Sequence, residues 1–330
     1  MNVRRNILGL LLAIMVLGLV GMGWYLFAKA ARTGRQTIAV SNLLSAIHDG
    51  SVQDVQKLLA QGAPVNGTSF NGETALGAAA LEGKLEIVRL LIAKGANVNE
   101  ANTSGGTPLI IAALQRKPEI IHLLLEHGAD AAFKDVSGNT AVAYALYSDA
   151  TDGDIVRLLI EKTGQTDAID GQGRTALMWA IRKGDSGLIE MLLAKKADVN
   201  VKDMAGKNAL VVALESGHPT LAERLLAQTK DVNAKGQSGA TPLMWAVARG
   251  NPALVKGLLD KGAAVNAQDD AGETALIGAT KENKGEIVAL LLAHKADVSL
   301  MDIQGLTALK WAVERRNTSI AQLLRQAAAK

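Results

Sequence analysis

The 330-residue sequence contains no cysteine and only ten aromatic residues. The absence of cysteine excludes disulfide frameworks, thiolate nucleophiles, iron–sulfur clusters and cysteine-based zinc sites. So few aromatic rings argue against a core of sheets or barrels. The apolar residues are mostly Ala, Leu, Val and Ile, and 33 glycines accompany them. This composition favours small side chains in closely packed helices.

Acidic residues are missing before residue 41, whereas this segment holds five basic residues: Arg4, Arg5, Lys29, Arg32 and Arg35. The net charge of +3 therefore comes from the N-terminal segment, because the rest of the chain carries 30 basic and 32 acidic residues. A remainder with a net charge of −2 argues against nucleic acid as a partner.

Residues 7–27 form a run of 21 residues without a charge, between a short basic tail (1–6) and a linker (28–39). A transmembrane helix needs about 20 such residues, and Trp24 and Tyr25 suit the membrane interface. The length of the run favours a signal anchor in the inner membrane, with the repeats described below facing the periplasm. The alternative is a signal peptide cleaved at Ala28-Lys29-Ala30, which would leave a soluble periplasmic protein.

A triplet of the form Thr-Ala-Leu or Thr-Pro-Leu recurs along the chain, beginning at Thr74, Thr107, Thr175, Thr241, Thr274 and Thr307, with Thr140 and Asn208 in register. The spacings are 33, 33, 35, 33, 33, 33 and 33 residues, and one step back from Thr74 leads to Ser41. These spacings define nine repeats in residues 40–330, which start near residues 40, 69, 102, 135, 170, 203, 236, 269 and 302. Such a period indicates stacked helical units.

Each repeat contains a short helix opened by Thr, a glycine turn, and a longer helix such as 85–92, closed by a glycine such as Gly95. The Thr side chain caps free amides, and the closing glycine supplies a left-handed conformation. Lys196, Thr229 and Lys295 replace that glycine, so each must leave or strain the left-handed conformation.

The seventh repeat carries the pattern most clearly, in Thr241-Pro242-Leu243, Ala246, Gly250, Leu258, Leu259, Gly262, Ala263, Val265 and Asn266. This pattern resembles the ankyrin repeat, and the resemblance covers about 290 residues. It implies an all-α solenoid of about nine helix-turn-helix units that binds a protein partner on a concave face of turn tips and first helices. The histidine that the family carries after Leu is replaced throughout, for example by Met178, Met244 and Lys310.

Four aromatic side chains share one position, four residues after the opening Thr: Tyr144, Trp179, Trp245 and Trp311. At 100° per residue, this position lies opposite the apolar stripe of the first helix. A base follows each tryptophan after four more residues, at Lys183, Arg249 and Arg315. Residues four apart on a helix meet, so we expect each cation to lie over its ring.

Two interpretations of this row remain open. Each indole packs across a smaller residue of an adjacent repeat, such as Val212 or Gly278. Alternatively, the row is a ridge that receives a carboxylate-bearing or apolar surface of a partner, since Trp and Arg are favoured anchors. Phe70 falls at a turn tip and is a second candidate contact.

Motifs for catalysis, cofactor binding or metal binding are missing. The five histidines are too scattered for a metal site, and the acidic residues within 148–154 lack the calcium-loop pattern. We therefore expect a non-catalytic protein without cofactor or small-molecule substrate. The main hypothesis is a membrane-tethered, exported module that binds a protein. The alternative is a soluble secreted protector or inhibitor of an exported enzyme or toxin, which the resemblance to bacterial stress-defence ankyrin proteins implies.

Overall fold

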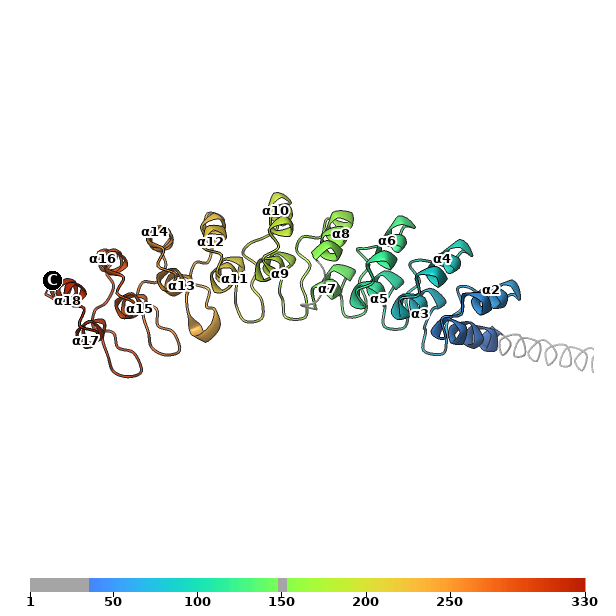
Figure 1. Ribbon diagram of the computed structural model, residues 1–330, viewed down its shortest axis with the longest axis horizontal. Helices are drawn as coiled ribbons and strands as arrows, with labels where there is room; N and C mark the ends of the chain where they lie inside the picture. Colours follow the sequence, from blue (N-terminus) through green and yellow to red (C-terminus); the bar gives the residue numbers. More distant parts are fainter. Residues whose placement is uncertain (1–35, 148–152, 330) are drawn as a thin grey trace, which may run out of the picture. The chain divides into compact units, whose positions relative to one another are not determined.

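The computed structural model describes residues 36–147 and 153–329. Within these ranges the backbone forms helices, turns and isolated bridges, so the all-α expectation is confirmed (Figure 1). The chain divides into two compact parts, an N-terminal part up to Ala145 and a C-terminal part from Leu146. The boundary falls in the fourth repeat, which is the one with two extra residues.

Each described repeat supplies a first helix and a second helix. The N-terminal part begins with a helix over residues 36–48, so the last residues of the predicted linker are already helical. Its other helices are α2 (Val52–Ala60), α3 (Ala75–Glu82), α4 (Leu85–Ala93), α5 (Pro108–Leu114), α6 (Pro118–Glu126) and α7 (Ala141–Leu146), which reaches the boundary. The C-terminal part contains α8 (Gly153–Thr163), α9 (Ala176–Lys183), α10 (Ser186–Ala194), α11 (Ala209–Glu215), α12 (Pro219–Leu226), η1 (Gln237–Gly239), α13 (Pro242–Ala248), α14 (Pro252–Asp260), α15 (Ala275–Lys281), α16 (Gly285–Ala293), α17 (Ala308–Glu314) and α18 (Thr318–Ala328).

The recurring threonine opens the first helix of the second to fifth and seventh to ninth repeats as predicted, whereas Ser41 of the first repeat lies inside the helix over residues 36–48. The hydroxyl of Thr74 accepts a hydrogen bond from the amide of Gly77 at 2.9 Å, and Thr274 accepts from Ile277 at 3.2 Å. Asn208 takes the same role through its side-chain oxygen. These capping residues are buried, so their hydrogen bonds satisfy amides that water does not reach. We refer below to the Thr or Asn at this position as the cap residue.

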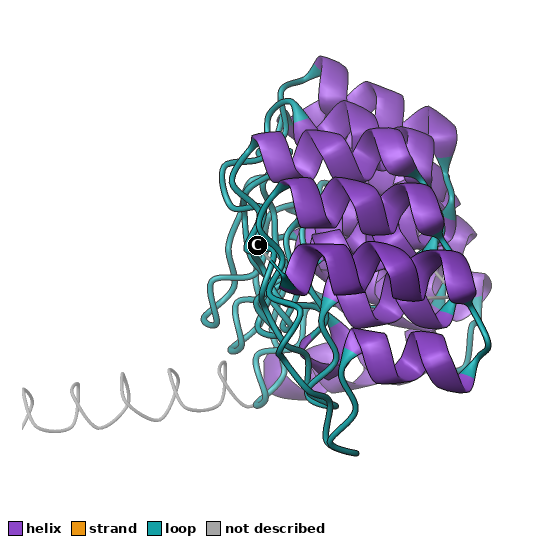
Figure 2. Ribbon diagram, turned by 90° about the vertical axis from the view of Figure 1, so that its left-hand side faces the viewer, coloured by secondary structure: helices purple, strands orange, loops and turns teal. Residues whose placement is uncertain are grey.

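First helices pack side by side within each part. In the second, third and fifth to ninth repeats, the first helix also packs against the second helix of its own repeat. The contact stripe is apolar, and Leu177 and Ile181 of α9 are completely buried. Hairpin loops connect successive repeats and lie to one side of the helices in each part (Figure 2). Neighbouring hairpins are joined through backbone bonds, such as Met204 N–H to the carbonyl of Gln172 at 2.9 Å.

Residues that replace the helix-closing glycine were expected either to keep the left-handed conformation or to leave it, and both cases occur. Lys196 and Lys295 keep the left-handed conformation, with φ of 61° and 63°. Thr229 is not among the residues with positive φ, and its hydroxyl donates to the carbonyl of Leu225 at 2.8 Å. The two lysines therefore hold a conformation that is strained for a residue with a Cβ atom.

Replacing Lys196 or Lys295 with glycine is expected to raise the free energy of unfolding by about 0.5–1 kcal/mol each, because glycine adopts positive φ without strain. Urea denaturation followed by circular dichroism measures the change. Thr229→Gly is the matched control, and we expect it to destabilise the protein, because it removes the bond to Leu225 and relieves no positive φ. Equal stabilisation by all three variants would contradict this explanation.

The predicted membrane segment, residues 7–27, lies outside the residues that the structure describes. Across 36–147 and 153–329, no helix is both long enough and apolar enough to cross a membrane.

Candidate functional site

The aromatic row predicted from the sequence lies on four first helices. Tyr144 is on α7, Trp179 on α9, Trp245 on α13 and Trp311 on α17. Tyr144, Trp245 and Trp311 are part-buried, whereas Trp179 is only 2% exposed. The ring of Trp179 is therefore packed inside the C-terminal part, as the packing interpretation expects.

The predicted contacts between cations and indoles are confirmed. Lys183 lies 5.7 Å from the centre of the Trp179 ring, Arg249 lies 6.0 Å from that of Trp245, and Arg315 lies 5.7 Å from that of Trp311. A fourth cation, which the sequence did not indicate, reaches Trp311 from the preceding repeat: Lys281 lies 4.8 Å from the ring. An exposed contact of this kind contributes about 0.5–1 kcal/mol.

The aromatic side chains of the fourth and ninth repeats also bond to the hairpin of their own repeat. The Tyr144 hydroxyl donates to Oδ2 of Asp135, and Nε1 of Trp311 donates to Oδ2 of Asp302 at 2.7 Å. Both aspartates lie five residues before the cap residue. Their Oδ1 atoms accept backbone amides of the hairpin, such as that of Gln304 at 2.9 Å. One carboxylate thus joins the hairpin to the first helix.

This acceptor is not among the residues predicted from the sequence, although the sequence contains a signal for it. An aspartate stands five residues before the cap residue in five repeats, at Asp135, Asp170, Asp203, Asp269 and Asp302. Its partner on the helix lies nine residues later in the chain. That separation crosses a turn and a helix start, so helical periodicity does not reveal the pair.

The hydrogen bonds to Asp302 shift its acidity. Burial raises the pKa of the Asp302 carboxyl, but the bonds from Trp311, Leu306 and Gln304, with the nearby charge of Lys281, outweigh burial and hold the pKa below its ordinary value. The pKa of Asp135 is also below its ordinary value. Burial raises this pKa, but the hydrogen bonds from Tyr144 and three hairpin amides lower it by a larger amount. Both carboxylates are therefore charged at neutral pH.

Trp311→Phe is expected to reduce the acid sensitivity of the protein. The folded-state pKa of Asp302 is depressed, so its contribution to stability is complete above the unfolded-state pKa and disappears as pH falls through the lower, folded value. Without the indole donor the depression shrinks, so stability at neutral pH falls and the difference from the wild type narrows below about pH 4. Urea titrations between neutral pH and about pH 3 measure this narrowing, and a constant difference across the range would contradict it.

Two members of the row have buried donors without an acceptor. Nε1 of Trp179 and Nε1 of Trp245 make no hydrogen bond to any described residue. In the fifth repeat, Oδ2 of Asp170 is instead bonded to Arg174, at 2.7 Å from Nε and 2.6 Å from Nη2. In the seventh repeat, the residue five before the cap is Gly236, which offers no side-chain acceptor.

Exposed apolar side chains occupy the hairpin tips, four residues before the cap residue. Phe70 is fully exposed, which agrees with its predicted place at a turn tip. Three aliphatic side chains occupy the same position in other repeats and are 77–81% exposed: Val136, Met204 and Ile303. Of these four side chains, only Phe70 was predicted as a contact from the sequence. Side chains this exposed contribute little to the core, so they remain available for contact with another molecule.

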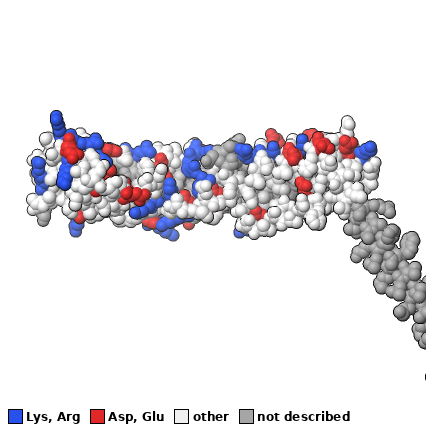
Figure 3. Space-filling view, turned by 90° about the horizontal axis from the view of Figure 1, so that it is seen from below, with Lys and Arg blue, Asp and Glu red and all other residues white. Residues whose placement is uncertain are grey.

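The exposed sides of the first helices differ between the two parts. Seven residues after the cap residue, the N-terminal part presents Leu81 and Leu114, both exposed. The same position in the C-terminal part holds charged residues such as Arg182 and Lys281. Seen from below, charged side chains are scattered over the C-terminal part, and the N-terminal part shows few away from its upper edge (Figure 3). We call the hairpin tips and these exposed sides of the first helices the hairpin face.

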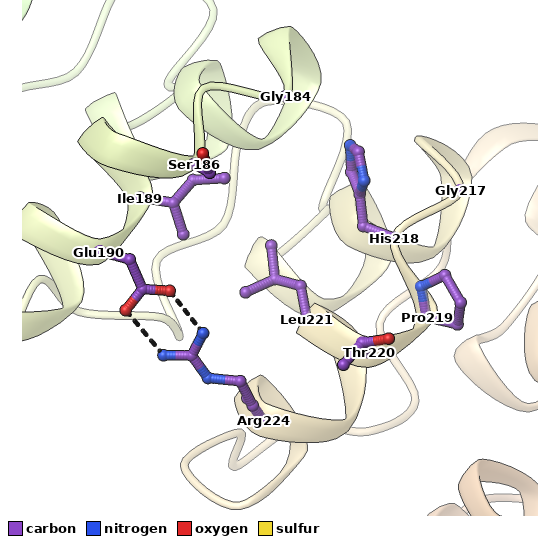
Figure 4. A pocket seen from close by; sticks show the side chains of 10 residues that line it. All are labelled: Gly184, Ser186, Ile189, Glu190, Gly217, His218, Pro219, Thr220, Leu221 and Arg224. Atoms are coloured by element: carbon purple, nitrogen blue, oxygen red, sulfur yellow. Dashed lines mark hydrogen bonds and ion pairs between the residues drawn. The ribbon is translucent and has the colours of Figure 1, made fainter.

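A hollow lies on the second-helix side of the C-terminal part, between α10 and α12 (Figure 4). Its volume is about 420 Å³, and Ile189 and Leu221 contribute apolar surface to it. Arg224 crosses to Glu190 with two hydrogen bonds of 2.5 and 3.0 Å. The bonds from Arg224 lower the pKa of Glu190, and those to Glu190 raise that of Arg224. The charges of Glu190 and Arg224 thus neutralise each other.

Each part is a stack of helix pairs joined by hairpins, which defines a repeat protein that presents an extended surface. Among the described residues, histidine, aspartate and glutamate do not gather into a group that could hold a metal ion. The family model for ankyrin repeats (three copies) matches residues 43–135, 129–203, 186–269 and 243–330, and the chain belongs to the ankyrin-repeat family. A search of curated proteins finds no match. Ankyrin repeats indicate a protein–protein interaction module.

Proposed function

We propose that this protein is a non-catalytic interaction module that binds its partner through the hairpin face. The apolar side chains exposed at the hairpin tips carry the proposal, two in the N-terminal part and two in the C-terminal part. Phe70, Val136, Met204 and Ile303 recur at one position of the repeat, although the fold gains little from them. Apolar side chains that stay exposed at the same position of a repeat are typical of a surface that a partner covers.

In the C-terminal part, the first-helix side of the hairpin face holds Trp245, Arg249, Trp311 and Arg315. Their rings are fixed by packing and by stacked cations, so little side-chain entropy remains to be lost on binding. Trp and Arg are also the residue types that contribute most often to binding hot spots. Trp179 is left out of the contact surface because its ring is buried, and its role is to support the helices on either side.

Site-specific photo-crosslinking tests the face. A photoreactive amino acid is placed at Met204 or Ile303 on the hairpin tips, and at Glu223 or Gln322 on exposed second-helix positions as controls. With the full-length chain in its native cells, we expect one discrete adduct from the tip positions and none from the controls. Adducts from the second-helix positions alone would place the partner on the opposite side and contradict the proposal.

We further propose that the module is exported and tethered to the inner membrane through residues 7–27, with the repeats in the periplasm. The uncharged run and its basic flanks support this proposal. Mass spectrometry of the mature N-terminus is the test of tethering: a chain that keeps residues 1–30 is expected, and one that begins at Ala31 would be the soluble form. Protease added to cells with a permeable outer envelope is expected to cut the repeats. Cutting only after complete lysis would contradict export.

A further inference from the structure

The chain contains no cysteine, so methionine is its only sulfur-containing residue type. Five methionines lie in the described ranges, and they differ widely in exposure. Met204 is 81% exposed and Met301 is 53% exposed, whereas Met178 is 1% exposed. Met191 and Met244 are part-buried. Met204 is therefore the most accessible sulfur-containing side chain among these five.

Met204 occupies the hairpin tip of the sixth repeat, four residues before the cap residue. Its backbone amide donates to the carbonyl of Gln172 at 2.9 Å. Oδ1 of the preceding Asp203 accepts the amides of Ala205 and Lys207 at 2.9 Å each. The backbone of the tip is thus held by hydrogen bonds, while the side chain extends into solvent. A chemical change at the sulfur alters the surface and leaves the hydrogen bonds of the hairpin in place.

Methionine differs from the other exposed tip residues in its reactivity. The same position carries Phe70, Val136 and Ile303, which are also apolar but have no atom that a peroxide oxidises readily. The thioether sulfur of methionine attacks one oxygen of hydrogen peroxide, so a sulfur–oxygen bond forms and the O–O bond breaks. Sulfur loses two electrons and the peroxide gains them. The proton of the transferred hydroxyl passes to the leaving hydroxide, and the products are methionine sulfoxide and water.

The other described methionines are less open to this reaction. Met178 lies in the core, and Sδ of Met244 accepts the amide of Thr241 at 3.4 Å. The backbone of Met301 pairs with that of Thr307 in an isolated bridge, and about half of its side chain is covered. Exposure therefore predicts that Met204 reacts first, Met301 next and Met178 last.

We propose that Met204 is a site of oxidation by peroxides on the hairpin face, and that its sulfoxide weakens binding of the partner. The thioether is apolar and adapts to an apolar contact, whereas the sulfoxide oxygen is a polar acceptor. A partner that covers the tip removes water from this oxygen, and burial of an unpaired polar group is unfavourable. The proposal rests on the hairpin face being the binding surface and adds a modification that lowers the affinity of that surface.

Peptide mapping by mass spectrometry tests the reactivity of the site. The full-length chain is treated with hydrogen peroxide, once in native buffer and once in urea. In native buffer we expect sulfoxide to accumulate at Met204 first, at Met301 next and at Met178 last. In urea the rates are expected to become similar, because unfolding exposes every sulfur. Equal rates at Met204 and Met178 in the folded protein would overturn the proposal.

Two variants test the effect on binding without an oxidant. Met204→Gln places a polar acceptor at the tip, as the sulfoxide does, and Met204→Leu keeps an apolar side chain that peroxide does not oxidise. Both carry the photoreactive amino acid at Ile303 and are expressed in the native cells. We expect the yield of the tip adduct to fall by about tenfold in Met204→Gln and to stay unchanged in Met204→Leu. Both are expected to keep the wild-type urea midpoint, because residue 204 is exposed.

Peroxide treatment of the same cells completes the test. The adduct yield of the chain with Met204 is expected to fall, and that of Met204→Leu to change much less, although any damage to the partner affects both equally. Equal losses in the two chains, or an unchanged yield in Met204→Gln, would overturn the proposal and leave the hairpin face as the binding surface. Absence of tip adducts from the untreated chain with Met204 would overturn the proposed function as well.

Discussion

Replacing Trp179 with alanine is expected to lower the free energy of unfolding by about 3–5 kcal/mol. The side chain is 2% exposed, and its neighbours on α9, Ala180 and Ile181, are completely buried. Removing a buried ring of this size leaves a cavity that the surrounding core fills only in part. Because the stability of a repeat protein depends on the interfaces between adjacent repeats, we also expect a broader urea transition by circular dichroism.

Trp179→Phe is the matched control for this prediction. Phenylalanine keeps most of the ring and removes the indole N–H that has no acceptor, so the loss of a large group is partly offset by the loss of an unpaired donor. We expect its stability to stay within about 1 kcal/mol of the wild type. A Trp179→Ala protein as stable as the wild type would show that this ring is not part of the core.

This prediction affects how binding is tested. A variant that removes Trp179 together with Trp245 and Trp311 would lose partner binding through unfolding, whatever the rings do on the surface. Substitutions at Trp245 and Trp311 alone keep the buried ring and report on the hairpin face. The packing interpretation therefore applies to Trp179, whose ring is buried in the core. The binding interpretation concerns the part-buried rings of Trp245 and Trp311.

Much of the fold could be predicted from the 33-residue period, because each repeat carries its own start and stop signals. Thr at the cap position, the glycine turns and the apolar stripe act within one repeat. The contacts of Lys183, Arg249 and Arg315 with their rings were predictable for the same reason, as residues four apart on one helix.

Burial of the individual rings was not predictable in this way. The 33-residue period predicts which side of the first helix carries the residue four after the cap residue. The exposure of that residue depends instead on side chains of neighbouring repeats, which differ along the chain. Trp179 and Trp311 thus share a position but not an environment. The contact of Lys281 with Trp311 also comes from an adjacent repeat. Aliphatic tips such as Met204 were not predictable from residue type, because only their shared position in the repeat distinguishes them from other apolar residues.

Asp170→Ala is expected to lower the free energy of unfolding by about 3–5 kcal/mol, as much as Trp179→Ala. The Asp170 side chain is 1% exposed, and that of Arg174 is 12% exposed. Oδ1 of Asp170 accepts the hairpin amides of Gln172 and Arg174 at 2.8 and 3.0 Å, and Oδ2 accepts two bonds from the Arg174 guanidinium. Alanine removes all four bonds and leaves a largely buried guanidinium without its carboxylate, which is the costly part of the change.

Asp269→Ala separates the hairpin bonds from the ion pair. Asp269 accepts the amides of Ala271 and Glu273 at 2.9 and 2.8 Å in the same type of turn, in a repeat with glutamate where the fifth repeat has Arg174. We expect a loss of about 1–3 kcal/mol for Asp269→Ala, measured by urea denaturation. The double variant Asp170→Ala/Arg174→Met is expected to recover part of the single-variant loss, because no unpaired charge remains. If instead the double variant is less stable than Asp170→Ala, the stranded guanidinium is not the source of the loss, and Arg174 stabilises the hairpin through its aliphatic stem.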